Sequence, residues 1–138
     1  MGDKQGDMHR WLVSQLRTRG FDESDCYNEE GVAVLVRPGD RVVVFYAYWF
    51  ERTWYLGACA RQGATYVLPD GSDVVAACVE WAADWKRTPP AEVSWGAEAP
   101  ADVVARLGLR QLSRAEIKVW FDAMAQAVKR RLRKLDEP

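Results

Sequence analysis

The spacing of apolar residues changes along the chain from helical to strand-like and back to helical. Residues 8–19 carry apolar side chains three and four positions apart and end before Gly20, which predicts a helix. The polar, acidic residues 21–30 predict a loop. Apolar runs with short gaps between them then predict strands. These runs are Val32–Arg37, Arg41–Phe50, Thr53–Ala60 and Ala64–Leu68.

The second half of the chain returns to helical spacing. The alanine-rich residues 73–86 predict a helix that ends before Pro89, and residues 88–100 are expected to form a loop. A short helix is predicted over 101–107. Ser113 and Glu116 match a capping box, and a long helix is expected to run from there to Leu135.

These elements predict one α+β domain over residues 1–138. It has an N-terminal helix, a four-stranded antiparallel β-meander, and a C-terminal layer of two to three helices packed on one face of the sheet. Antiparallel pairing is expected because the gaps between the strands are short. The turns are placed at Pro38-Gly39, Glu51-Arg52 and Gln62-Gly63. Residues 1–7 and 136–138 are expected to fray.

The aromatic-rich segment VVVFYAYWFERTWYL, residues 42–56, reads as a hairpin. With Glu51-Arg52 at its tip, Trp49 faces Trp54 and Tyr48 faces Tyr55. Because side chains alternate along a strand, one face of the sheet is then wholly apolar. The helices at 73–86 and 114–135 are expected to cover that face. Its members include Phe45, Ala47, Trp49, Trp54 and Leu56.

The opposite face collects Tyr46, Tyr48, Tyr55 and Tyr66. A tyrosine has an apolar ring and a polar tip, so this face is expected to be half-exposed and to contact a partner protein. In the alternative interpretation the N-terminal helix covers it and the hydroxyl groups find partners inside the protein. The assignment depends on the strand register, because a shift of one residue exchanges the two faces.

Composition narrows the class of protein. The chain has 138 residues and a formal net charge of −1, which suits one ordinary folded domain. Its longest apolar run is well short of the roughly 20 residues of a membrane helix, so no membrane contact is expected.

Three cysteines without a C-x-x-C pair favour neither a disulfide framework nor a zinc site, and indicate a cytoplasmic protein. The excess of Arg over Lys is typical of GC-rich genomes and indicates a bacterium or phage.

Charge is distributed unevenly along the chain. Residues 1–104 hold ten basic and sixteen acidic residues, whereas residues 105–138 hold nine and four. The positive end is the last predicted helix. This cluster either complements the helix dipole or contacts nucleic acid. Its members are Lys129, Arg130, Arg131, Arg133 and Lys134.

Motifs for catalysis are not found in the sequence. The single histidine, His9, lies near a terminus that is expected to fray, where it could not hold a substrate proton within reach. Two carboxylate pairs, Glu80 with Asp84 and Asp70 with Asp73, have structural explanations at helix termini and in an ion pair. No catalytic residue, metal ligand or cofactor site is therefore assigned.

The sequence favours a small, cytoplasmic, non-enzymatic module that binds another protein through the tyrosine face. By elimination, its size and composition suit a phage accessory, immunity or antitoxin-like role. The alternative is a nucleic-acid-binding accessory protein that uses the basic helix. A small-ligand sensor domain comes third, and the sequence leaves the oligomeric state open.

Overall fold

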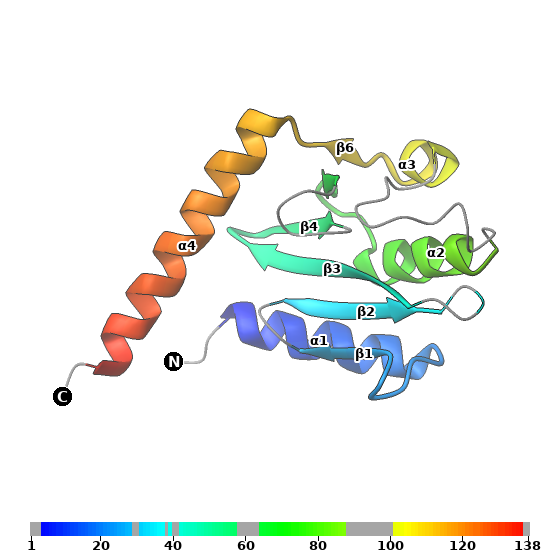
Figure 1. Cartoon of the computed structure of the whole chain (residues 1–138), viewed down its shortest axis with the longest axis horizontal. Coiled ribbons are helices and arrows are strands. Elements are labelled where there is room, and N and C mark those ends of the chain that lie inside the picture. The colour runs from blue at the N-terminus through cyan, green and yellow to red at the C-terminus, as the bar shows by residue number, and fades with distance from the viewer. Residues whose placement is uncertain are drawn as a thin grey trace.

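The computed structural model describes residues 4–28, 31–37, 39, 42–57, 64–87 and 101–136, without the side chains at 127, 128, 131, 132 and 134–136. It is an α+β structure with an N-terminal helix, a six-stranded antiparallel sheet and C-terminal helices (Figure 1). The elements are α1 (Lys4–Thr18), β1 (Cys26–Asn28), β2 (Val32–Val36), β3 (Val43–Phe50), β4 (Thr53–Gly57), β5 (Thr65–Val67), α2 (Val74–Arg87), α3 (Ala101–Leu107), β6 (Arg110–Gln111) and α4 (Arg114–Asp136).

The four predicted strands correspond to β2–β5, and the hairpin register is confirmed. Trp49 pairs with Trp54 and Tyr48 with Tyr55, with Glu51-Arg52 at the tip. The predicted turn at Gln62-Gly63 and the predicted loop at 88–100 lie outside the described residues. The strand count was wrong, because two short strands, β1 and β6, extend the meander at its two edges in the order β1-β2-β3-β4-β5-β6.

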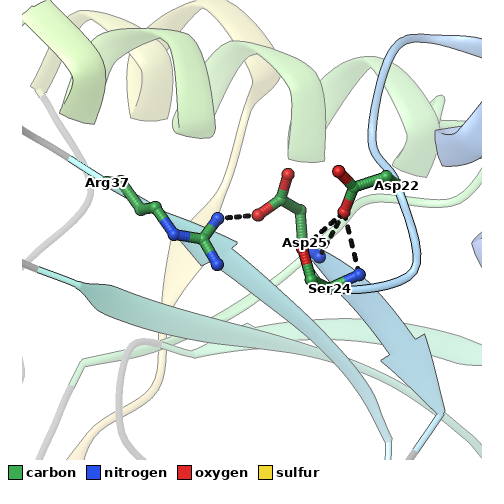
Figure 2. Close-up of polar contacts among 4 residues, drawn as sticks. All are labelled: Asp22, Ser24, Asp25 and Arg37. Carbon is green, nitrogen blue, oxygen red and sulfur yellow. Dashed lines mark hydrogen bonds and ion pairs between the residues drawn. The ribbon is translucent and has the colours of Figure 1, made fainter.

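Strand β1 forms within the stretch expected to be a loop, and Figure 2 shows the polar contacts beside it. The Asp22 carboxylate accepts hydrogen bonds from the backbone N–H and hydroxyl of Ser24, at 2.8 and 2.7 Å, and from the N–H of Asp25. The two bonds from Ser24, the hydroxyl bond first, hold the pKa of Asp22 below its ordinary value. Asp25 in turn forms an ion pair with Arg37, beyond the end of β2. The acidic stretch is therefore a turn that brings β1 against β2.

The apolar face of the sheet is covered by α1 and α2. The Trp81 ring of α2 stacks on Phe45 of β3 at 5.0 Å, while Leu12 and Leu16 of α1 are fully buried in the same core. The prediction that the last helix shares this cover was wrong, and so was the alternative that α1 covers the tyrosine face. Both faces of β3 are apolar or aromatic, so the sequence pattern alone does not decide which helix covers which face.

Helix α1 is fixed to the sheet by the backbone of one residue. The backbone N–H of Trp49 donates to Nε2 of His9 at 2.9 Å, and the Gln5 side-chain amide donates to the carbonyl of Trp49 at 2.8 Å. The helix begins at Lys4, so residues 4–7, for which the sequence predicts fraying, form its first turn. His9 is buried and acts here as a structural acceptor.

Replacing His9 by alanine should lower the free energy of unfolding by about 1–3 kcal/mol. The reason is that the N–H of Trp49 loses its acceptor in a part-buried position. Urea unfolding followed by circular dichroism measures this loss. Arg10→Ala, one position along α1 and exposed, is the control. Equal losses in the two variants would contradict the structural role of His9.

Helix α4 has the predicted bounds and the predicted cap. The Ser113 hydroxyl accepts from the N–H of Glu116 at 3.2 Å, and the Glu116 carboxylate accepts from the N–H of Ser113 at 3.0 Å. Trp120 is the only buried side chain of α4 among those described. The C-terminal helices therefore do not form one layer on one face, and Figure 1 shows α4 slanting past the strand ends with its C-terminal half clear of the sheet.

The described helices include none with the length and apolar composition needed to cross a bilayer. Cys26 and Cys78 are free thiols buried in the core. Burial raises the pKa of both, that of Cys26 to about 11, so both remain protonated at neutral pH. Cys59 lies outside the described residues.

Candidate functional site

Two of the four predicted tyrosines contact Trp120 of α4 on the second face of the sheet, and a third stacks on one of these two. We call Tyr46, Tyr48, Tyr55 and Trp120 the Tyr–Trp cluster. Tyr48 lies edge-on to the Trp120 ring with centroids 5.4 Å apart, and Tyr55 lies 5.1 Å from it. Tyr46 stacks on Tyr48 at 5.9 Å. Trp120 and Tyr48 are buried, whereas Tyr46 and Tyr55 are half-buried.

A glycine makes room for this cluster. Gly31, directly before β2, lies so close to the Tyr48 ring that a Cβ built on it would be 2.5 Å from Cδ1. Any side chain at position 31 would therefore displace the ring from Trp120. Gly31 is a residue of the site that the sequence pattern did not reveal, because it reads there as an ordinary loop glycine.

Tyr66 does not belong to the cluster. Leu56 of β4 pairs with Tyr66, and Tyr55 pairs with Val67, so Tyr66 points to the apolar face and Val67 to the tyrosine face. Tyr66 is 2% exposed and packs edge-on against Trp81 at 5.8 Å. The predicted face was wrong because the prediction assumed a two-residue turn at Gln62-Gly63, which places Tyr66 on the tyrosine face. The observed pairing of Tyr66 with Leu56 has the opposite parity, and a shift of one residue moves every side chain of a strand to the other face.

A cavity of about 470 Å³ opens beside the cluster, between the tip of the β3–β4 hairpin and the first half of α4. We call it the α4 groove. Its apolar wall includes Phe50, Tyr55, Val67, Val119 and Trp120.

Val119 is 69% exposed, so the α4 groove presents apolar surface directly to solvent. In the sequence Val119 lies outside the helical spacing of Ile117, Trp120 and Phe121, so the apolar pattern gives no signal for it.

Charged side chains border the α4 groove. Arg110 of β6 forms an ion pair with Glu116 at 2.8 Å, and Glu51 lies at the hairpin tip. The backbone hydrogen bond from Ser113, followed by the Arg110 contact, lowers the pKa of Glu116 below its ordinary value. Burial, with a smaller contribution from Glu51, raises the pKa of Tyr55. The Tyr55 hydroxyl is therefore neutral and can donate a hydrogen bond at physiological pH.

The indole N–H of Trp120 is buried and has no hydrogen-bond acceptor among the described residues. Buried donors are nearly always paired in folded proteins, and leaving one unpaired costs about 1–3 kcal/mol. Trp120 also lines the α4 groove. The unpaired donor and the exposed apolar wall thus occur at the same place.

The hairpin tip beside the groove is conformationally strained. Glu51 and Arg52 both have positive φ, +50° and +63°, as in the two-residue turns that normally use Asn-Gly. Neither residue type favours this region. Backbone strain of this kind concentrates at functional sites, and here it sets the position of Glu51 at the groove.

The double variant E51N/R52G should be more stable than the wild type by about 1 kcal/mol, because Asn-Gly adopts this turn without strain. Urea unfolding measures the change. E51N alone should give a smaller gain, because a non-glycine residue remains at position 52. Destabilisation of the double variant would contradict the turn geometry.

The basic end of α4 is separate from the Tyr–Trp cluster. Lys129, Arg130 and Arg133 are exposed, whereas the side chains of Arg131 and Lys134 lie outside the described residues. Trp120 and Phe121 lie more than one helical turn away, and Trp120 faces the sheet. The described part of this end therefore has charge for phosphate contacts but no aromatic surface for base stacking.

The described residues contain no group of three His, Cys, Asp or Glu side chains placed to hold a metal ion. Of the carboxylate pairs considered in the sequence, Asp84 bonds to Arg87 at 3.2 Å, and Asp73 caps α2 through the N–H of Ala76 at 3.1 Å. Both have the structural roles expected of them. A second, larger cavity of about 690 Å³ lies along α1 and β1, with Arg10, Val13 and Arg17 in its wall, and the described residues that line it include no aromatic side chain.

The α4 groove and the Tyr–Trp cluster thus combine half-buried aromatic side chains with a buried indole donor that has no acceptor among the described residues. No protein family, curated protein or solved structure matches this chain.

Proposed function

We propose that this protein is a small, non-enzymatic module that binds another protein through the α4 groove and the adjoining half-buried tyrosines. The observation that carries the proposal is the apolar wall of the groove, in which Val119 is 69% exposed and Phe50 and Tyr55 are half-buried. Protein interfaces concentrate binding energy in a few aromatic anchors surrounded by a polar rim. Arg110, Glu116 and Glu51 supply such a rim.

The unpaired N–H of Trp120 supports the same proposal. Because Nε1 is buried, a carbonyl or carboxylate oxygen of a partner reaches this donor only when binding moves the surrounding side chains, and the new bond would remove the cost of leaving the donor unpaired. The Tyr55 hydroxyl offers a second donor nearby. We include in the proposal a cytoplasmic location in a bacterium or phage-infected cell, and an immunity, antitoxin-like or phage accessory role.

Nucleic acid binding is the second candidate, favoured by the exposed Lys129, Arg130 and Arg133. Phosphate contacts by these residues would give binding that weakens steeply with salt. A small ligand is the third candidate, because the volume of the α4 groove is in the range of small-molecule sites.

The test is affinity capture with matched surface variants. Val119→Arg places a long charged side chain in the groove wall, whereas Val42→Arg makes the same change at a residue that is 52% exposed and precedes β3, at the end of the strand away from the hairpin tip. Immobilised wild type and Val42→Arg should retain the same protein from a nuclease-treated bacterial lysate at 0.3 M salt. Val119→Arg should lose it.

Retention of the same protein by all three forms would overturn the α4 groove as the site. Retention of nucleic acid alone, in a parallel capture at low salt from a lysate without nuclease treatment, would favour the second candidate. In that case the triple reversal of Arg130, Arg131 and Arg133 to Glu should abolish the shift of a short DNA duplex at low salt, while the circular dichroism spectrum stays unchanged.

A further inference from the structure

Helix α4 has a second apolar surface that the groove does not use. Ile117, Phe121 and Met124 are only half-buried, and none of them lines the α4 groove. Phe121 and Val119 are two positions apart, so they project from opposite sides of the helix. The same spacing continues in the sequence at Val128, Leu132 and Leu135. We call Ile117, Phe121 and Met124 the α4 stripe.

The α4 stripe is covered only in part by its own chain, because its three side chains are half-buried. Figure 1 shows the C-terminal half of α4 standing clear of the sheet. The helix has 23 residues, so it is about 34 Å long, comparable to the diameter of a small domain. An amphipathic helix of this length with an uncovered apolar side needs an external partner.

The charges of the chain indicate what the partner is. Helix α4 contains seven basic and three acidic residues, a net charge of +4, with the exposed Lys129, Arg130 and Arg133 in its C-terminal half. Residues 1–104 have a net charge of −6, from ten basic and sixteen acidic residues. Helix α4 and residues 1–104 therefore carry opposite net charges. Within one chain, the basic C-terminal half of α4 stands clear of the sheet.

We propose that a second copy of this chain covers the α4 stripe, with the two α4 helices side by side and antiparallel about a two-fold axis near Met124. In that arrangement the basic end of each helix lies beside the other copy's first half of α4 and its acidic body. A parallel pair would place the two basic ends together, where like charges repel. Closed two-fold pairs are the commonest oligomers of soluble proteins.

Two other occupants fit fewer of the observations. Nucleic acid would use the basic residues and leave Phe121 and Met124 in water. An anionic bilayer would accept the stripe and the basic residues, but Asp122 is exposed on the same helix and the acidic body would approach the lipid surface. The dimer does not depend on partner binding at the α4 groove, because it uses the other side of the helix.

Sedimentation velocity and light scattering of the full chain measure the oligomeric state directly. The wild type should have twice the chain mass of 15.7 kDa at micromolar concentration, and 1 M salt should promote dissociation because it screens the charges between the copies. A monomer at every concentration in low and physiological salt would overturn the proposal. So would binding of that monomer to anionic vesicles or to a DNA duplex, because the stripe would then serve another partner.

Matched variants assign the interface and separate this inference from the proposed function. Met124→Glu should raise the dimer Kd at least about tenfold, as loss of one anchor contact does, and should still retain the groove partner. Val119→Glu, also on α4, should remain dimeric and should lose the groove partner. A dimer that is insensitive to Met124→Glu, with wild-type circular dichroism, would contradict the α4 interface even if Val119→Glu behaves as expected.

Single cysteines test the helix direction. In an antiparallel pair with its axis at Met124, the two copies of Met124 are neighbours, whereas the two copies of Ile117 are about 21 Å apart along the helices. Met124→Cys should therefore form an intermolecular disulfide on mild oxidation and Ile117→Cys should not, because the Cα atoms must approach within about 7 Å. Cross-linking of both variants would show a parallel pair and overturn the arrangement. The wild type, with Cys26 and Cys78 buried, controls for the native thiols.

Discussion

Replacing Trp81 by alanine should lower the free energy of unfolding by about 3–5 kcal/mol, enough to unfold much of a marginally stable domain. Trp81 is fully buried at the centre of the core. Its ring stacks on Phe45 at 5.0 Å and makes edge contacts with Tyr66 and Trp85 at 5.8 and 5.6 Å. The substitution removes all three contacts and leaves a cavity between α2 and the sheet.

Urea unfolding followed by far-UV circular dichroism measures this effect. The control is Trp11→Ala, which removes the same side chain from a position that is 44% exposed on α1 and should cost less than about 1 kcal/mol. A second variant, Trp81→Phe, keeps most of the ring volume and removes an indole N–H that has no acceptor among the described residues. Its loss should be clearly smaller, and equal losses in Trp81→Phe and Trp81→Ala would contradict this account.

The parts of the fold that the sequence predicted are those with strong local causes. The hairpin register follows from a two-residue tip, which pairs Trp49 with Trp54. The start of α4 follows from the reciprocal bonds of Ser113 and Glu116. In both cases residues close in sequence determine the structure, so a single chain is enough to read it.

The errors have causes that are distant in sequence. Strand β1 depends on the ion pair of Asp25 with Arg37, and three residues with one buried side chain give no alternating pattern. The face of Tyr66 depends on the length of the connection from β4. The position of α1 depends on the bonds of His9 and Gln5 to the backbone of Trp49, about forty residues away.

Only part of the candidate site could be predicted, because some of its contacts also join residues that are distant in sequence. Tyr46, Tyr48 and Tyr55 follow from strand alternation. In the sequence Trp120 has the same helical spacing as the other apolar residues of the last helix. The pattern does not show that its side chain packs on the tyrosine face of the sheet. The α4 groove lies beside this contact, because Trp120 is the buried side chain among those described on α4 and Val119 next to it remains exposed.

Replacing Trp120 by alanine should release α4 from the sheet while the body of the protein stays folded. Trp120 is 6% exposed and is the buried side chain through which the described part of α4 contacts Tyr48 and Tyr55. Losing a buried tryptophan removes about 3–5 kcal/mol of packing. The loss should weaken the packing of α4 on the sheet and leave the main core intact, because α1 and α2 pack on the opposite face of the sheet.

Hydrogen exchange measured by mass spectrometry distinguishes local release from global unfolding. In Trp120→Ala, amides of α4 and of the hairpin 46–55 should exchange at least about tenfold faster, while amides of α2 keep their wild-type protection. Partner capture at the α4 groove should be lost, because one wall of the groove moves away. Trp120→Phe should retain the docking in part, since a smaller ring still fills the space between Tyr48 and Tyr55. Equal loss of protection in α2 and α4 would show that α4 unfolds together with the core. The α4 groove would then be part of one cooperative folding unit, and α4 would not be a weakly docked helix.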